Sequence, residues 1–166
     1  DIADALGIGV FFIAEPGRKN AVGIKDARII SEEELVQMEN AQFVIGVGDG
    51  KIRRKIAGRF PSLSFCNLIH PSATIGIGQR QELDKGTGII VSAGVRLSNN
   101  IRVGNFTLFN LNSTVSHDCE IGNFSTISPS ASIAGNVVLG DCVFVGIGAK
   151  ISNGTDDKKL KVQNGA

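Results

Sequence analysis

The sequence of 166 residues contains no Trp and no Tyr, so nine Phe supply all of its benzenoid aromatic side chains. No apolar run approaches the roughly 18 residues that a membrane-spanning helix requires. Charge of neither sign dominates, because 17 basic residues face 16 acidic ones and the net charge is +1. Without a basic stripe interleaved with aromatic residues, the pattern argues against a nucleic acid as a partner. We therefore expect a soluble chain with a small-molecule partner.

Histidine and cysteine are also scarce. The two histidines, His70 and His117, are too few for a zinc site with three imidazole ligands, and no HxH or HExxH spacing supports another metal site. We predict no bound metal. The three cysteines, Cys66, Cys119 and Cys142, are an odd number without CxxC spacing, which indicates free thiols and a cytoplasmic location.

Glycine, in contrast, is abundant at 21 residues, and the second half of the chain has a six-residue period. Four residues after each apolar anchor stands a second inward candidate that is mostly small, and Gly, Ser or Asn mostly follows the anchor directly. Neither a helix nor an alternating strand has this period. It is typical of the hexapeptide repeat of a parallel β-helix, in which three hexads form one triangular coil. The anchors are Val91, Leu97, Val103, Phe109, Val115, Ile121, Ile127, Ile133, Leu139, Val145 and Ile151.

We assign residues 67–166 to this β-helix domain, and two breaks in the period predict loops. The polar stretch Gln79–Lys85 predicts a loop inserted between coils. After Ile151 the phase changes again, because Val162 follows at eleven residues rather than twelve. The charged residues 156–159 are most simply a solvated loop. We expect the chain to stop in the middle of a coil, with further coils missing.

Residues 1–66 predict a small Rossmann-like α/β domain, because predicted strands, glycine turns and helices alternate. Ser31 followed by Glu34 is a capping-box pattern and predicts a helix from residue 31 to about residue 38. We expect the first strand of such a domain to be absent, because the chain begins inside a helix. The other predicted elements are a helix tail at 1–6, strands at 9–13 and 43–47, a turn at 15–20 and a helix at 51–56.

His117 is the candidate general base. It lies beside Asp118 in the segment Val115-Ser116-His117-Asp118-Cys119, where it is expected to project outward near a corner. A histidine next to a carboxylate suits proton transfer at neutral pH. The alternative is an ordinary surface histidine, since adjacent residues on a strand usually point to opposite faces.

Two other motifs carry weaker hypotheses. His70 precedes Pro71 at the boundary between the two regions, where we expect it to cap the first coil rather than to act in catalysis. The sequence Gly48-Asp49-Gly50 precedes a basic helix and could hold a phosphate on its backbone N–H groups. The same glycine turn between a strand and a helix is also common without any ligand.

Three segments together point to a known family. They are Asn67–Ala73 (NLIHPSA), Val115–Gly122 (VSHDCEIG) and Ala134–Gly140 (AGNVVLG), and Phe43–Ile56 adds a fourth likeness in the first region. In these segments the chain resembles the sialic acid O-acetyltransferases and bacillosamine-pathway UDP-sugar N-acetyltransferases, which are hexapeptide-repeat sugar acyltransferases. The resemblance implies a left-handed β-helix, a homotrimer with active sites between subunits, and acetyl-CoA as acetyl donor.

The resemblance also implies roles for single residues. His117 matches the general base that takes a proton from the acceptor amine or hydroxyl, and Asp118 matches the acidic residue that raises its basicity. By their positions relative to His117, Gly135, Ile147 and Gly165 would line the acetyl-CoA groove through backbone contacts.

Three further positions bear on ligand binding. Thr126 stands nine residues after His117, where several members of the family carry a second histidine near the cofactor, so it is expected at the cofactor too. Gly48 and Asp49 would face the nucleotide or sugar. The family's glycine-rich, His-containing nucleotide turn has no counterpart in the sequence, and Ala14-Glu15 stands where the family has two consecutive acidic residues.

The sequence thus predicts an acetyl-CoA-dependent acetyltransferase of surface-glycan synthesis, with direct transfer in a ternary complex. It leaves open whether the acceptor is the amino group of a nucleotide sugar or a hydroxyl group of a sialic acid. The alternative from another class is a non-catalytic trimeric β-helix that serves as a scaffold or binds a nucleotide sugar.

Overall fold

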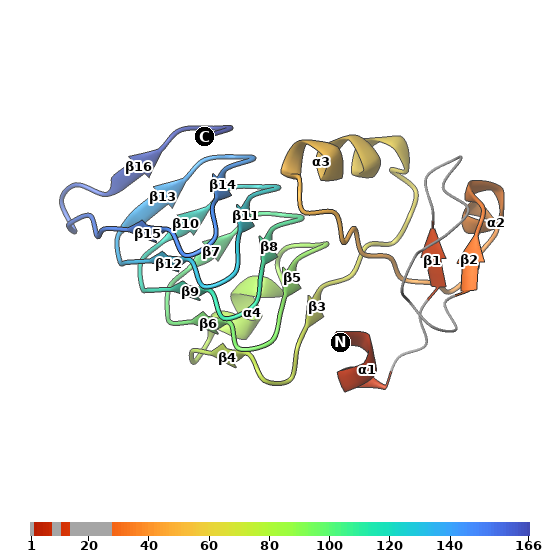
Figure 1. Cartoon of the computed structure of the whole chain (residues 1–166), viewed down its shortest axis with the longest axis horizontal. Coiled ribbons are helices and arrows are strands. Elements are labelled where there is room, and N and C mark those ends of the chain that lie inside the picture. Colours follow the sequence, from red (N-terminus) through yellow and green to blue (C-terminus); the bar gives the residue numbers. More distant parts are fainter. Residues whose placement is uncertain (1, 8–10, 14–27) are drawn as a thin grey trace.

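The computed structural model describes residues 2–7, 11–13 and 28–166, which form an N-terminal α/β region and a parallel β-helix. Figure 1 shows the β-helix as a stack of short strands, with α3 beside it and α2, β1 and β2 beyond α3. The N-terminal elements are α1 (Ile2–Leu6), β1 (Phe11–Ile13), β2 (Arg28–Ile30), α2 (Glu32–Val36) and α3 (Gly50–Arg59). The predicted combination of an α/β region and a β-helix is confirmed.

The short helices of the N-terminal region begin where the sequence predicts. At α2 the Ser31 hydroxyl accepts the Glu34 N–H and the Glu34 carboxylate accepts the Ser31 N–H, so the capping box is formed. β1 and β2 pair in parallel. The predicted turn at 15–20 and the first residues of the predicted strand at 9–13 lie outside the described residues, as does Ala14-Glu15.

The predicted strand at 43–47 is wrong. Only Phe43 bridges another segment, at Phe65, and the Phe43 N–H donates to the carbonyl of Ser64 at 2.9 Å. Farther along, the carbonyls of Val47 and Gly48 accept hydrogen bonds from a side chain, that of Arg53. Side-chain donors thus replace the neighbouring strand that would have completed a ladder.

Three parallel sheets make up the three sides of the β-helix. The first sheet has the order β14-β11-β8-β5-β3, the second β15-β12-β9-β6-β4, and the third β16-β13-β10-β7. The strands are β3 (Leu68–Ile69), β4 (Thr74–Ile75), β5 (Ile90–Val91), β6 (Arg96–Leu97), β7 (Arg102–Val103), β8 (Leu108–Phe109), β9 (Thr114–Val115), β10 (Glu120–Ile121), β11 (Thr126–Ile127), β12 (Ser132–Ile133), β13 (Val137–Leu139), β14 (Phe144–Val145), β15 (Lys150–Ile151) and β16 (Leu160–Val162).

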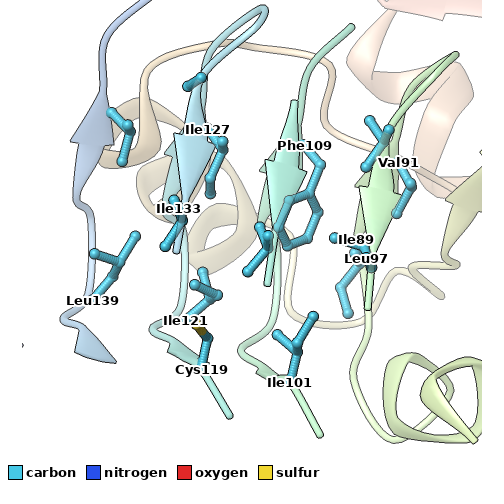
Figure 2. Close-up of a cluster of buried hydrophobic side chains, with 14 of the residues drawn as sticks. Ile89, Val91, Leu97, Ile101, Phe109, Cys119, Ile121, Ile127, Ile133 and Leu139 are labelled. Carbon is cyan, nitrogen blue, oxygen red and sulfur yellow. The ribbon is translucent and has the colours of Figure 1, made fainter. Parts of the chain in front are cut away.

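The six-residue anchors point inward and stack in register. Ile127 lies opposite Phe109 on one side and Val145 on the other, 18 residues away in each direction, as three hexads per coil require. Figure 2 shows these side chains filling the interior. The second inward positions are equally buried, with Thr107 and Ser125 fully enclosed. The interior is therefore filled by alternating large and small side chains, as the sequence predicts.

The corners share a backbone conformation that is unusual for residues other than glycine. Every sixth residue from Asn100 to Cys142 has a positive φ between 54° and 59°. Two of them are Phe106 and Phe124, whose rings stack on each other with centroids 5.0 Å apart. Because L-residues resist this conformation, the stacked coils must hold each corner in place through backbone hydrogen bonds. These corners position the outward side chains of the site.

The predicted loop at Gln79–Lys85 contains a short helix, α4 (Gln79–Leu83), which takes the place of a strand. The buried Gln79 amide donates to the carbonyl of Ile101 at 2.6 Å and accepts the Ile101 N–H at 2.9 Å. One side chain thus supplies the donor and the acceptor that a strand below β7 would have offered. This substitution explains why the first coil departs from the 18-residue spacing without disturbing the sheets above it.

Candidate active site

His117 and Asp118 form the corner between β9 and β10, where the second sheet passes into the third. The carboxylate Oδ2 of Asp118 lies 2.7 Å from Nδ1 of His117. Asp118 has a φ of 59°, and its N–H donates to the carbonyl of Asn99 in the preceding coil at 3.2 Å. On a strand the two side chains would diverge, whereas the turned corner brings them together.

Two hydrogen bonds orient the Asp118 carboxylate. One oxygen faces His117, and the other accepts the side-chain amide of Asn100. The hydrogen bond from His117, then that from Asn100, and to a lesser extent the charge of Lys159, hold the pKa of Asp118 below its usual range. The carboxylate is therefore ionised at neutral pH.

An ionised carboxylate fixes the tautomer of the imidazole. Because the Asp118 oxygen accepts a hydrogen bond, Nδ1 of His117 carries the proton and Nε2 keeps its lone pair. The His117 side chain is 61% exposed, so a ligand can approach Nε2 from outside. The pair has the arrangement of a general base with its orienting carboxylate.

Gly135 lies at the same corner one coil later and gives the imidazole its space. A Cβ atom at this position would stand 2.8 Å from Cε1 and 3.0 Å from Nε2 of His117. Its φ is not positive, so the close approach of the ring, and not the backbone conformation, explains the glycine here. Gly135 therefore lies beside His117, and its contact with acetyl-CoA stays a prediction.

The segment inserted between β15 and β16 lies over the same corner. The Gly154 N–H donates to the carbonyl of Gly135 at 3.0 Å, and Lys159 donates to the Glu120 carboxylate at 2.8 Å. Residues 156–159, predicted to be only a solvated loop, border a hollow of about 430 Å³ together with Glu120. The loop thus forms one wall of the surface next to Asp118.

Asp49 and Gly48 lie at the start of α3, away from the His117 corner. The Asp49 carboxylate accepts the N–H groups of Lys51 and Ile52 at 2.8 and 3.1 Å, so it caps the helix. The N–H groups of Lys51 and Ile52, directly after the Gly48-Asp49-Gly50 motif, are therefore already satisfied. A contact of Gly48 or Asp49 with a nucleotide or sugar stays a prediction.

Thr126 takes part in the contact between the two regions. Its side chain is buried on the outer side of the first sheet, and its hydroxyl donates to the carbonyl of Gly48 at 2.7 Å. The predicted cofactor contact of Thr126 is untested, but its one described side-chain hydrogen bond joins the β-helix to the turn before α3.

The remaining predicted cofactor residues lie at the other two corners. Ile147, 79% exposed, stands between β14 and β15, where the first sheet passes into the second. Gly165 follows β16 at the end of the third sheet, with its N–H donating to the carbonyl of Asp141 at 2.8 Å. One chain by itself therefore does not bring Ile147 and Gly165 to His117.

His70 has a local structural role, as the sequence predicts. Its Nδ1 accepts the Ser72 N–H at 3.0 Å and also contacts the Ser72 hydroxyl at 2.8 Å. In the described part of the chain, no group of three or more His, Cys, Asp or Glu side chains is arranged to hold a metal ion. Within residues 2–7, 11–13 and 28–166, no helix is long and apolar enough to cross a membrane.

Sequence reasoning missed Asn100 and Lys159, whose hydrogen bond and charge act on Asp118. Asn100 precedes Asp118 by 18 residues, which is one full coil, so the repeat itself could have identified it. Lys159 has no such signal, because five extra residues between β15 and β16 shift it out of the repeat.

Known proteins are similar to this chain in sequence and in fold. A GDP-perosamine N-acetyltransferase from Escherichia coli O157:H7 is 30% identical over 125 residues, covering 74% of this chain. The chain spans 55% of that protein's length. No protein-family model matches the chain.

Among solved structures, WeeI from Acinetobacter baumannii AYE superimposes with a TM-score of 0.80 at 23% identity, covering 93% of this chain and 72% of its own. A perosamine N-acetyltransferase from Caulobacter crescentus, a His-to-Asn mutant in complex with CoA and GDP-perosamine, has a TM-score of 0.65 at 25% identity. That alignment covers 84% of this chain and 68% of the other.

In sequence and in fold the chain is thus similar to sugar N-acetyltransferases whose structures are built on a parallel β-helix. Its resemblance to sugar acyltransferases is thereby confirmed. The WeeI structure shows that the same fold occurs in a known protein.

Proposed function

We propose that the chain transfers the acetyl group of acetyl-CoA to an amino group of a nucleotide-linked sugar, in the synthesis of a surface glycan in the cytoplasm. The observation that carries the proposal is the 2.7 Å contact between His117 Nδ1 and the Asp118 carboxylate, with the imidazole exposed. The named activity of the Escherichia coli relative and the CoA and GDP-perosamine bound to the Caulobacter protein support the same donor and acceptor class.

The chemistry follows from the tautomer. Nε2 of His117 takes a proton from the acceptor amine as its nitrogen attacks the thioester carbonyl of acetyl-CoA. The tetrahedral intermediate then expels the CoA thiolate, which receives the proton from the imidazolium. Asp118 keeps the imidazole oriented and stabilises its positive charge. In this reaction the residues beside His117, Gly135 among them, position the thioester.

We further propose that the active unit is a homotrimer with its sites between chains. Gly135 lies beside His117, whereas Ile147 lies at a different corner of the same β-helix. If both contact one acetyl-CoA, the Ile147 must come from a second copy whose corner faces the His117 corner of the first. A cyclic arrangement with the same contact repeated three times meets this requirement.

The decisive experiment measures CoA release from acetyl-CoA with a panel of acceptors: GDP- and UDP-linked 4-amino sugars and sialic acids. We expect release with one class of nucleotide-linked amino sugar. His117→Ala is expected to lower kcat by about 10²- to 10⁴-fold while leaving the fold and the oligomer intact. The control His70→Ala removes the other histidine, whose side chain contacts Ser72 in the same turn, and should keep full turnover.

Each outcome of the panel has a meaning. Release with a sialic acid alone would replace N-acetylation by O-acetylation. No release with any acceptor, from a folded protein that also fails to bind acetyl-CoA, would instead favour the scaffold alternative. Loss of folding in His117→Ala would make the histidine a structural residue.

A further inference from the structure

Arg53 is buried between α3 and the β-helix and has no carboxylate partner among the described residues. Its side chain is 1% exposed, yet the guanidinium is surrounded by carbonyl groups alone. A buried cation is costly unless every donor is satisfied. Burial lowers the pKa of Arg53, while the nearby Cys142 and Asp49 oppose that change.

The five N–H donors of the guanidinium are all used. Nε donates to the carbonyl of Phe106 at 2.9 Å, and Nη2 donates to the carbonyls of Phe124 and Ser125, both at 2.9 Å. Phe106 and Phe124 are the corner residues of two successive coils. Arg53 thus binds the β-helix at a corner where Phe106 and Phe124 share the same positive-φ backbone conformation.

The other end of the fork holds the turn before α3. Nη1 donates to the carbonyls of Val47 and Gly48 at 2.7 and 3.0 Å, and the Gly48 carbonyl also accepts the Thr126 hydroxyl at 2.7 Å. The turn has no strand ladder of its own to define it. Its position relative to the β-helix is therefore set by these two side chains, one from each side.

We propose that Arg53 is a positioning residue for the acceptor, through its hold on the Gly48-Asp49 turn. This inference rests on the proposed function and on the sequence-based prediction that Gly48 and Asp49 face the nucleotide or sugar. A planar fork that binds five carbonyls fixes both the distance and the angle of the turn, which a lysine with a single nitrogen cannot do. Arg53 itself touches neither substrate in this assignment.

Arg54 provides a matched control on the same helix. It also joins α3 to the β-helix, through Asp141 at 3.0 Å and by stacking 5.1 Å from the centroid of the Phe124 ring. Unlike Arg53, it is half exposed and makes no hydrogen bond to the turn. A variant at Arg54 therefore weakens the contact between the regions without releasing Gly48.

The test compares KM values for GDP-perosamine, or the acceptor that the panel identifies, and for acetyl-CoA. Arg53→Lys is expected to raise the acceptor KM about tenfold or more, because a small misplacement of a binding group is costly. The KM for acetyl-CoA should stay within about twofold, since His117 and Gly135 keep their places. Arg54→Gln should leave both KM values unchanged.

An unchanged acceptor KM in folded Arg53→Lys, or an equal rise in Arg54→Gln, would overturn the proposal. Should Arg53→Lys fail to fold, Thr126→Val removes only the second bond to Gly48 and should raise the acceptor KM by a smaller factor. A rise in the KM for acetyl-CoA in that variant would contradict it and place Thr126 at the cofactor.

The failure of the proposed function is recognisable separately. If the wild-type protein turns over no acceptor, the transferase assignment fails. Hydrogen exchange of the backbone amides of residues 46–49 then still reports whether Arg53 fixes the turn. Exchange should become faster in Arg53→Lys and stay unchanged in Arg54→Gln. Unchanged exchange in Arg53→Lys would show that Arg53 does not fix the turn.

Discussion

At the scale of single residues, the pairing of His117 with Asp118 depends on a corner rather than on a strand. The positive φ of Asp118 turns its carboxylate toward the neighbouring imidazole, and Asn100 holds the second oxygen. The spacing alone favoured an ordinary surface histidine, because strand geometry separates adjacent side chains. At the corner, by contrast, the two adjacent side chains meet.

Asp118→Asn tests the orienting role. An asparagine amide can donate to Nδ1 and favour the wrong tautomer, so kcat should fall about 10²-fold or more with little change in the KM for acetyl-CoA.

The lowered pKa of Asp118 means that the carboxylate stabilises the fold above the usual pKa of an aspartate, and that this contribution is lost as pH falls through the lowered value. In urea unfolding, the difference in stability between the two proteins should therefore be larger at pH 7 than at strongly acidic pH. An equal difference at both pH values would contradict this account.

Gly135→Ala tests the space beside the imidazole. The added Cβ would stand 2.8 Å from Cε1 of His117, so the exposed ring must move, and kcat should drop about tenfold while the fold persists. Gly146→Ala, where an added Cβ meets nothing within 4 Å, is the control. Similar kcat values in both variants would show that the ring position is not critical.

At the scale of elements, the period of six predicted the β-helix because its physical cause is local. Each hexad carries its own inward anchor and small partner, so the strands could be placed from Val91 to Ile151. The strand at 43–47 was wrong and α4 was missed, since both depend on side chains from elsewhere in the chain. In the segment 43–47, the Arg53 side chain binds the carbonyl of Val47. In α4, the Gln79 side chain binds the backbone of Ile101, which lies 22 residues later.

The same contrast yields a prediction for α4. Gln79→Leu leaves both backbone groups of Ile101 without their partner, at a cost of about 1–3 kcal/mol for each group that stays buried and unsatisfied. The exposed Gln81 on the same helix is the control, and Gln81→Leu should change the free energy of unfolding by less than about 0.5 kcal/mol. Chemical denaturation of both variants checks this, and equal stabilities would mean that α4 does not act as a strand substitute.

At the scale of the whole molecule, the candidate site could be predicted only in part. Residues one coil apart, such as His117 and Gly135, follow from the repeat. Ile147 and Gly165 do not, because a linear period does not say which of three corners will face a partner, and the five extra residues before β16 change the count. In the proposed trimer, neighbouring chains would bring together the predicted cofactor residues that a single chain separates.

Mixed oligomers test this separation. His117→Ala and Ile147→Asp are each expected to be nearly inactive, the second because a charge replaces an exposed apolar residue at the cofactor. In trimers formed from equal amounts of both, about a quarter of the sites would combine two intact residues from neighbouring chains, if sites lie between subunits. Activity of the co-assembled mixture measures this, and sedimentation checks the trimer. No recovery in mixed trimers would place each site within one chain.

The two insertions have a consequence for how such a protein can diversify. α4 and the segment before β16 both interrupt the repeat, yet the strands on either side keep their register, with Ile75 opposite Leu97 and Leu139 opposite Val162. Corners therefore accept extra residues without any change to the interior. Since one such insertion borders a hollow with Glu120, residues 156–159 can be exchanged to alter the proposed acceptor preference while His117, Asp118 and the core stay as they are.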